Sequence, residues 1–132
     1  MRDIKFRAWN KILNRMDNWY DLVDKNLRNI FIMKDHNGYE LMQYTGLHDK
    51  NGKEIYEGDI VKIHKHSYDY GLKQDEIGQI KFIDGAFGFY REKTKNEYYF
   101  NDLATENGYG ELDYYEVIGN VWENGNLLND SK

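Results

Sequence analysis

Two histidines and an aspartate are the residues of this chain that could bind a metal ion. His64 and His66 lie two apart in a predicted strand, so their side chains share one face, and Asp69 follows them. Such a pair with a nearby carboxylate could hold a metal. However, Lys62 and Lys65 flank the pair, and the spacing supplies too few ligands for a closed site. We therefore favour a solvated strand end and expect no metal and no cofactor.

Three carboxylates, Glu54, Glu57 and Asp59, gather along one predicted hairpin arm and the corner that follows it. Paired carboxylates can perform acid–base catalysis when their environments separate their pKa values. Here no nucleophile, base and orienting group converge by motif, Cys is absent, and the chain has no glycine-rich phosphate loop. Acidic residues at turns are ordinary, so the sequence predicts a protein that is not an enzyme and has no catalytic residues.

A segment rich in aromatic and basic residues, between residues 65 and 99, offers the candidate binding residues. Aromatic rings can stack on bases while basic side chains contact phosphates, as in β-barrel proteins that bind nucleic acids. The net charge of -5 opposes this interpretation, because such proteins usually carry a broad basic surface. The alternative is that the tyrosines pack in half-buried strands. The candidates are Tyr68, Tyr70, Phe89, Arg91, Lys93 and Tyr98.

The composition limits the class of protein. A chain of 132 residues can bury its own core as one domain or two closely packed subdomains. The absence of Cys excludes disulfides and thiol chemistry, and the absence of Pro means that Gly, Asn and Asp must supply the turns. No apolar run approaches a membrane span, and the first residues lack the apolar stretch of a signal peptide. We therefore expect a cytoplasmic protein that does not bind a membrane.

Glycine-bearing turns divide the chain into short apolar segments typical of strands. Asn51-Gly52 predicts a tight hairpin, and Asp84-Gly85 predicts a second one between strands at residues 77–83 and 86–90. The first half is typical of a meander, with strands at residues 4–8, 16–23, 27–33 and 39–44. Further strands are expected at residues 59–64, 97–100 and 116–122, the last with a bulge at Gly119, and a helical turn at 101–106.

From Gly58 onward, the expected order is a strand, a long loop, a hairpin, an irregular link and a final strand. A small SH3-like barrel needs this order, and its closure would protect exposed strand edges. The sequence therefore predicts an all-β protein in which an N-terminal β meander subdomain, residues 1–57, packs on a C-terminal SH3-like β-barrel subdomain, residues 58–132. We expect Trp9, Trp19 and Trp122 in the core or between the subdomains, because of their large apolar area.

Three segments of the chain resemble the YopX family, small proteins encoded by bacteriophages and prophages. They are IKFRAWNK at residues 4–11, LMQYTGL at 41–47 continued by DKNGKEIYEGDIV at 49–61, and EVIGNVWEN at 116–124. They come in the family's order and span nearly the whole chain. The resemblance implies an all-β protein with an SH3-like C-terminal part, of phage or prophage origin, in the cytoplasm of a host cell. It implies no particular activity and no catalytic residue.

The sequence favours a non-enzymatic protein-binding or interaction module, a phage accessory protein that contacts a host or phage protein. This hypothesis depends on the lack of a catalytic motif and on the use of SH3-like scaffolds for docking. The alternative is a nucleic-acid-binding protein that uses the aromatic and basic residues of the predicted barrel. Residues 1–15 carry five basic residues against one acidic, and residues 101–132 carry seven acidic against one basic. We expect the two ends to lie near each other and partly neutralise; the alternatives are a basic N-terminal face for a partner and head-to-tail pairing of copies as a homo-oligomer.

Overall fold

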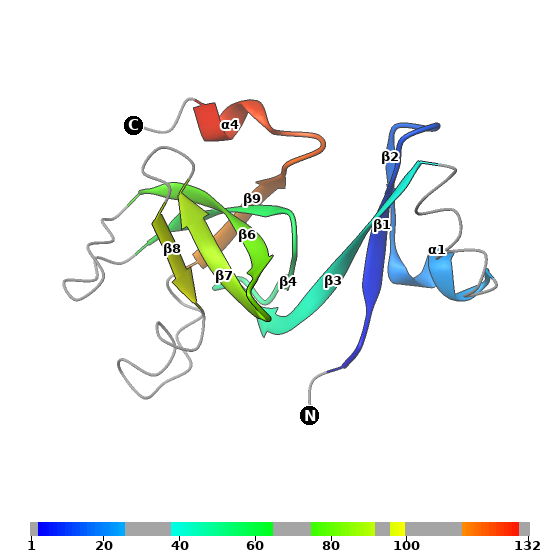
Figure 1. Ribbon diagram of the computed structural model, residues 1–132, viewed down its shortest axis with the longest axis horizontal. Helices are drawn as coiled ribbons and strands as arrows, with labels where there is room; N and C mark the ends of the chain where they lie inside the picture. The colour runs from blue at the N-terminus through cyan, green and yellow to red at the C-terminus, as the bar shows by residue number, and fades with distance from the viewer. Residues whose placement is uncertain (1–2, 26–37, 65–74, 92–95, 100–114, 130–132) are drawn as a thin grey trace.

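The computed structural model describes residues 3–25, 38–64, 75–91, 96–99 and 115–129. Within these ranges the protein is mainly β, as the sequence predicts, with two antiparallel sheets and two short helices. Figure 1 shows the sheets in the two halves of the molecule, with one long strand running from one half to the other. None of the helices in the described part of the chain is long and apolar enough to cross a membrane.

The N-terminal sheet has four strands in the order β2-β1-β3-β4. These are β1 (Phe6–Asn10), β2 (Arg15–Asp17), β3 (Tyr39–His48) and β4 (Glu54–Tyr56). Ala8, Leu22 and Tyr39 form its small buried core. The expected hairpin at Asn51-Gly52 is confirmed between β3 and β4, where Gly52 has a φ of 83°.

The expected strand at residues 16–23 is wrong in its second half, where helix α1 (Trp19–Val23) replaces it. Asn18 caps this helix, since its side-chain oxygen accepts the Asp21 N–H at 3.0 Å and the Asp21 carboxylate accepts the Asn18 N–H at 3.0 Å. This reciprocal capping box satisfies backbone donors that a helix start leaves free. The helix also buries Leu22, so the cap and one apolar contact outweigh the β preference of the segment.

The C-terminal sheet has five strands in the order β8-β7-β6-β5-β9. They are β5 (Asp59–Ile63), β6 (Ile77–Ile83), β7 (Ala86–Arg91), β8 (Asn96–Tyr99) and β9 (Tyr115–Asn120), and helix α4 (Asn126–Asn129) follows. The hairpin at Asp84-Gly85 is confirmed, as is the bulge at Gly119, where the register with β5 shifts. The expected strand at 27–33, the helical turn at 101–106 and most of the long loop lie outside the described residues, and the subdomain boundary stays a prediction.

An ion pair between the two sheets is almost fully buried. The Arg7 Nη2 of β1 lies 2.8 Å from Oδ1 of Asp59 in β5, and the two side chains are 12% and 2% exposed. Asp59 Oδ2 also accepts the Tyr56 N–H at 2.8 Å. Burial raises the pKa of the Asp59 carboxyl, while the Arg7 guanidinium acts against that rise. Each charge is therefore tolerated in the interior because the other is present.

A second buried carboxylate, Asp49, joins the tip of the β3–β4 hairpin to β9. Its Oδ1 accepts the N–H groups of Asn51 at 2.8 Å and Lys53 at 2.9 Å, and its Oδ2 accepts the Val117 N–H at 2.9 Å. Burial would raise the pKa of the Asp49 carboxyl, but the three backbone donors outweigh it and the pKa is lowered. Ile55 of β4 then reaches the core of the other sheet, beside Val61 and Ile80.

Replacing one partner of the Arg7–Asp59 pair should be costly. We expect R7M and D59N each to lower the free energy of unfolding by about 3–5 kcal/mol, because each leaves an uncompensated polar or charged group in the interior. The double variant should lose less than the sum of the two by about 1–3 kcal/mol. Urea unfolding of the four proteins measures this coupling. Additive losses would show that the two charges act independently.

Acid should weaken the hairpin attachment through Asp49. The pKa of this carboxyl is lower in the folded state, so its contribution is present above the unfolded value of about 3.9 and is lost as the pH falls through the folded pKa. D49N should cost about 1–3 kcal/mol at pH 7 and flatten the loss of stability below about pH 4. D84N, at an exposed turn, is the control. An acid profile of D49N equal to that of the unchanged protein would contradict the assignment.

Candidate functional site

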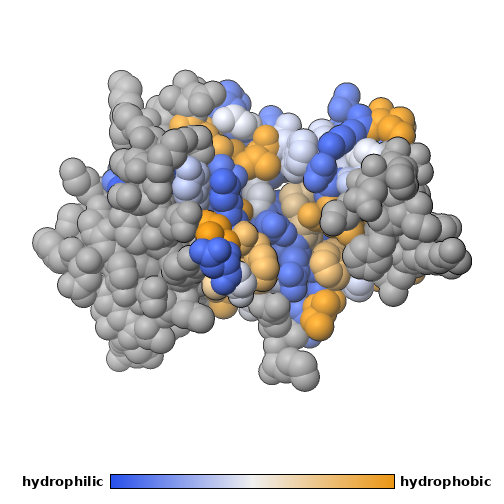
Figure 2. Space-filling model, in the orientation of Figure 1, coloured by the Kyte–Doolittle hydropathy of each residue, from blue (hydrophilic) through white to orange (hydrophobic). Residues whose placement is uncertain are grey.

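A cleft of about 310 Å³ lies between the two sheets. Residues 40–42 of β3 form one wall, residues 79–82 of β6 form the other, and the corner at Glu57 and Gly58 forms the floor with Val121 and Trp122 after β9. Figure 2 shows hydrophobic and hydrophilic side chains next to one another on the surface that joins the two halves. The walls combine apolar and polar residues, and concave sites of this kind are where ligands usually bind.

Gly58 holds the floor of the cleft together. Its N–H donates to the carbonyl of Ile80 at 2.8 Å, and its own carbonyl accepts the Val121 N–H at 2.9 Å. Its φ of 87° favours glycine, and a Cβ at this position would lie 2.8 Å from Met42 Sδ. The Glu-Gly-Asp corner that the sequence displays is thus the point where β3, β6 and the segment after β9 meet.

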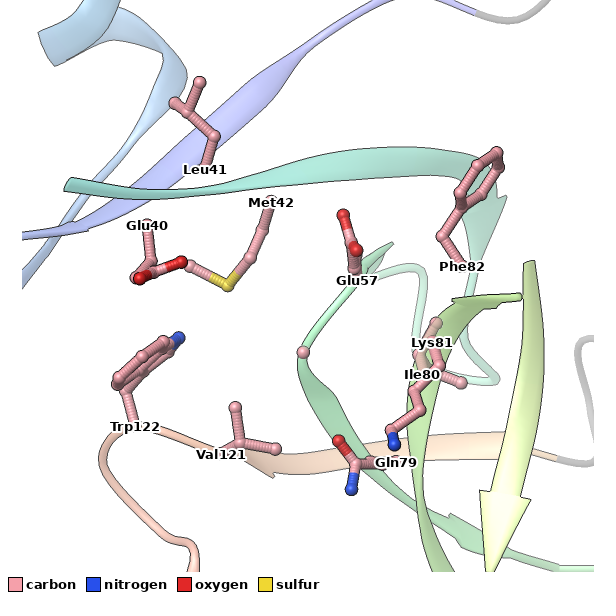
Figure 3. Close-up of a pocket in the computed structure, with 11 residues that line it drawn as sticks. Glu40, Leu41, Met42, Glu57, Gln79, Ile80, Lys81, Phe82, Val121 and Trp122 are labelled. Atoms are coloured by element: carbon pink, nitrogen blue, oxygen red, sulfur yellow. The ribbon is translucent and has the colours of Figure 1, made fainter. Parts of the chain in front are cut away.

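Two aromatic side chains stand at opposite ends of the cleft, and Figure 3 shows Glu57 between them. Trp122 is 38% exposed and stacks on Trp9 with ring centroids 6.0 Å apart and an interplanar angle of 7°. This stack confirms the expected packing between the halves. Phe82 is 48% exposed and leans edge-on against the buried ring of Phe87. Because both rings have a packed neighbour, they are held in place while part of their surface stays open.

The charged groups of the cleft are Glu40, Glu57 and Lys81. Glu40 binds the ammonium of Lys11 at 2.7 Å. The Lys81 ammonium lies over the Tyr90 ring, 4.1 Å from its centroid. Glu57 takes part in none of the ion pairs found among the described residues, and its Oε1 accepts only the Gln43 N–H, at 3.2 Å.

Of the residues considered for metal binding or acid–base chemistry, those that the structure describes each contact a different partner. His64 binds Glu116 at 2.9 Å, whereas His66 and Asp69 lie outside the described residues. In the part of the chain that the structure describes, no three His, Asp or Glu side chains could hold a metal ion together. Of the three hairpin carboxylates, Glu54 binds Lys5, Asp59 binds Arg7, and only Glu57 faces the cleft.

The predicted aromatic and basic residues are only partly described. Phe89 is fully buried in the core of the C-terminal sheet, so its ring does not face the solvent, and Arg91 Nη1 donates to both carboxylate oxygens of Glu76 at 2.7 Å. Tyr98 lies opposite Phe89 on β8. The remaining three, Tyr68, Tyr70 and Lys93, lie outside the described residues, and their common surface stays a prediction.

The sequence did not indicate the cleft, because its walls come from segments far apart in the chain. The available signals were a Gly in a positive-φ corner and two aromatic residues at strand ends, Phe82 and Trp122. Neither signal shows which face of a strand stays open after packing, and strand-end aromatics more often complete a core.

The chain matches the family model described as YopX protein over residues 5–129. Its structure is similar to the crystal structure of protein EF1440 from Enterococcus faecalis, with 28% identity and a TM-score of 0.60, covering 97% of this chain and 99% of that chain. It is also similar to the crystal structure of yopX from Bacillus subtilis, with 22% identity and a TM-score of 0.51, covering 93% and 96%, which shows the fold alone. A comparison with curated proteins gave no match.

A side chain at Gly58 should disturb the cleft floor. We expect G58A to cost more than the roughly 1–2 kcal/mol of a left-handed backbone, because its Cβ would also meet Met42. G52A is the matched control, since Gly52 has a φ of 83° and nothing lies within 4 Å of an added Cβ. Thermal unfolding compares the two, and G58A should cost less in an M42A background than in the unchanged protein, although M42A alone is destabilising because Met42 is buried. Equal losses in both glycine variants would contradict the tight contact at the floor.

Proposed function

We propose that this chain, which belongs to the YopX family, is a non-enzymatic protein-binding module and that the cleft between its sheets is the binding site. The observation that carries this proposal is the pair of partly exposed aromatic rings, Trp122 and Phe82, at the two ends of a formed cleft. Aromatic residues fixed by packing lose little conformational freedom on binding and dominate the energy of many interfaces.

The lining of the cleft supports binding rather than catalysis. Met42 and Ile80 line the cleft but are buried, so its open apolar surface comes from Phe82, Val121 and Trp122, and its polar groups are two carboxylates, an amine and an amide at separate positions. A mixture of apolar and polar side chains is usual over a protein-binding surface taken as a whole. The proposal therefore requires no chemical step, only burial of the open aromatic surface by a partner.

We also infer that the C-terminal sheet is an SH3-like barrel. Four consecutive strands form a meander, and the last strand, β9, returns to pair with the first, β5. This order supports the barrel expected from the sequence, and SH3-like scaffolds often serve as docking modules, which is an argument by analogy. A phage or prophage origin, and action on a host or phage protein in the host cytoplasm, follow from the family resemblance and belong to the same proposal.

The nucleic-acid alternative has less support. Phe89 is buried and Arg91 is paired with Glu76, so two of the six candidate residues are already engaged inside the protein. The cleft itself carries two carboxylates, which would repel a phosphate backbone.

Replacing the cleft aromatics should abolish partner binding. Immobilised protein is used to capture proteins from lysates of Enterococcus faecalis and Bacillus subtilis, the sources of the two similar structures. We expect F82S and W122A each to capture about one-tenth, or less, of the amount captured by the unchanged protein. Truncating an aromatic anchor of an interface costs about 2 kcal/mol or more of binding free energy. Quantitative mass spectrometry measures the difference.

Y20A is the control, because Tyr20 is 80% exposed and does not line the cleft. It should capture as much as the unchanged protein. Equal capture by all variants would place binding elsewhere, and capture that a nuclease removes would favour the nucleic-acid alternative.

A further inference from the structure

We infer that the cleft accepts a polypeptide segment in which an arginine is next to a large apolar residue, with the guanidinium on Glu57. This inference rests on the proposed function and adds to it the chemistry of the partner. It depends on three observations: the negative charge of Glu57 in the cleft, the open aromatic surface beside that carboxylate, and the positions of the described cations.

Glu57 brings a negative charge into the cleft that no described cation neutralises. Its backbone is fixed, since its N–H donates to the Gln43 carbonyl at 2.9 Å and its carbonyl accepts a bond from Arg7 Nη2 at 3.3 Å. Oε1 accepts the Gln43 N–H, and no hydrogen bond to a described residue reaches Oε2. A half-buried carboxylate whose Oε2 and second Oε1 lone pair are available suits a cationic ligand, and the net charge of -5 adds to the attraction.

The cations near the cleft have other partners. Lys81 is held over the Tyr90 ring, and Figure 3 shows its ammonium pointing away from Glu57. Lys11 binds Glu40 and lies 5.8 Å from the Trp122 ring centroid. Arg7 has its Nη2 on Asp59 and its Cζ 4.8 Å from the Tyr56 ring centroid. A partner therefore supplies the missing cation more readily than this chain does.

Arginine fits this site better than lysine. A guanidinium can donate two parallel bonds to a carboxylate while its plane stacks on an aromatic ring, whereas an ammonium is a strongly hydrated point charge. Trp122 and Phe82 flank Glu57 and keep open surface, and Met42 lies between β3 and the floor. An apolar residue next to the arginine would cover this surface, as in interfaces where a charged contact is surrounded by packed apolar groups.

Synthetic peptides test the inference without knowledge of the natural partner. The probes are Ac-Gly-Leu-Arg-Leu-Gly-NH2 and the same peptide with citrulline, lysine or glutamate in place of arginine. Citrulline keeps the shape of arginine and removes its charge. Titrations of 15N-labelled full-length protein are followed by the amide signals of Met42, Gly58 and Phe82 and the indole signal of Trp122. We expect the arginine peptide to bind about tenfold more tightly than the citrulline peptide, with lysine intermediate and glutamate weakest.

E57Q should remove the preference for arginine over citrulline, whereas E123Q, the same change at an exposed Glu outside the cleft lining, should keep it. Equal affinity of the arginine and citrulline peptides in the unchanged protein would overturn the inference, and this comparison needs no variant to fold. If both bind at the cleft, the proposed protein-binding function stands. If no peptide changes the NMR signals of these four residues, the inference is also overturned. The lysate capture tests the proposed function independently. If the NMR signals of these residues change with protein concentration in the absence of peptide, the occupant of the cleft is a second copy of this chain and the inference is overturned.

Discussion

The buried ion pair between Arg7 and Asp59 fixes how the two sheets meet. Arg7 belongs to the first strand of one sheet and Asp59 to the first strand of the other, so the pair joins the halves near their centre. Neither charge could remain in the interior alone, and the same guanidinium also binds the carbonyl of Glu57. The corner at residues 57–59 is therefore held from one side by a charge and from the other by the backbone bonds of Gly58. The floor of the cleft is thus attached to both sheets.

Turn chemistry made much of the fold predictable from sequence. Asn51-Gly52, Asp84-Gly85 and Gly119 each placed a hairpin or a bulge correctly, because each conformation depends on one or two residues. The helix at Trp19–Val23 was missed although Asn18 and Asp21 have capping-box spacing. A short apolar segment carries no reliable periodicity, so its neighbours decided its structure.

The candidate site was much less predictable than the fold. Phe89 lies between Gly88 and Tyr90 on β7, so it faces the opposite side of the sheet from these two neighbours. The sequence pattern alone could not show which side of the sheet the core would cover. Trp122 was correctly expected between the halves, but its exposed part depends on the position of Trp9, more than a hundred residues earlier. Glu57 has the sequence context of an ordinary turn carboxylate, and only the positions of the described lysines and arginine show that none of them pairs with it.

The Trp9–Trp122 stack has a consequence for the time at which the cleft is completed during synthesis. The first sheet takes its four strands from residues before 57, although Arg7 in it also needs Asp59 as its ion-pair partner. The cleft, by contrast, takes Val121 and Trp122 as part of its lining. During synthesis Trp9 is therefore made well before the ring that it stacks on, and the lining of the cleft is complete only once residue 122 is in place.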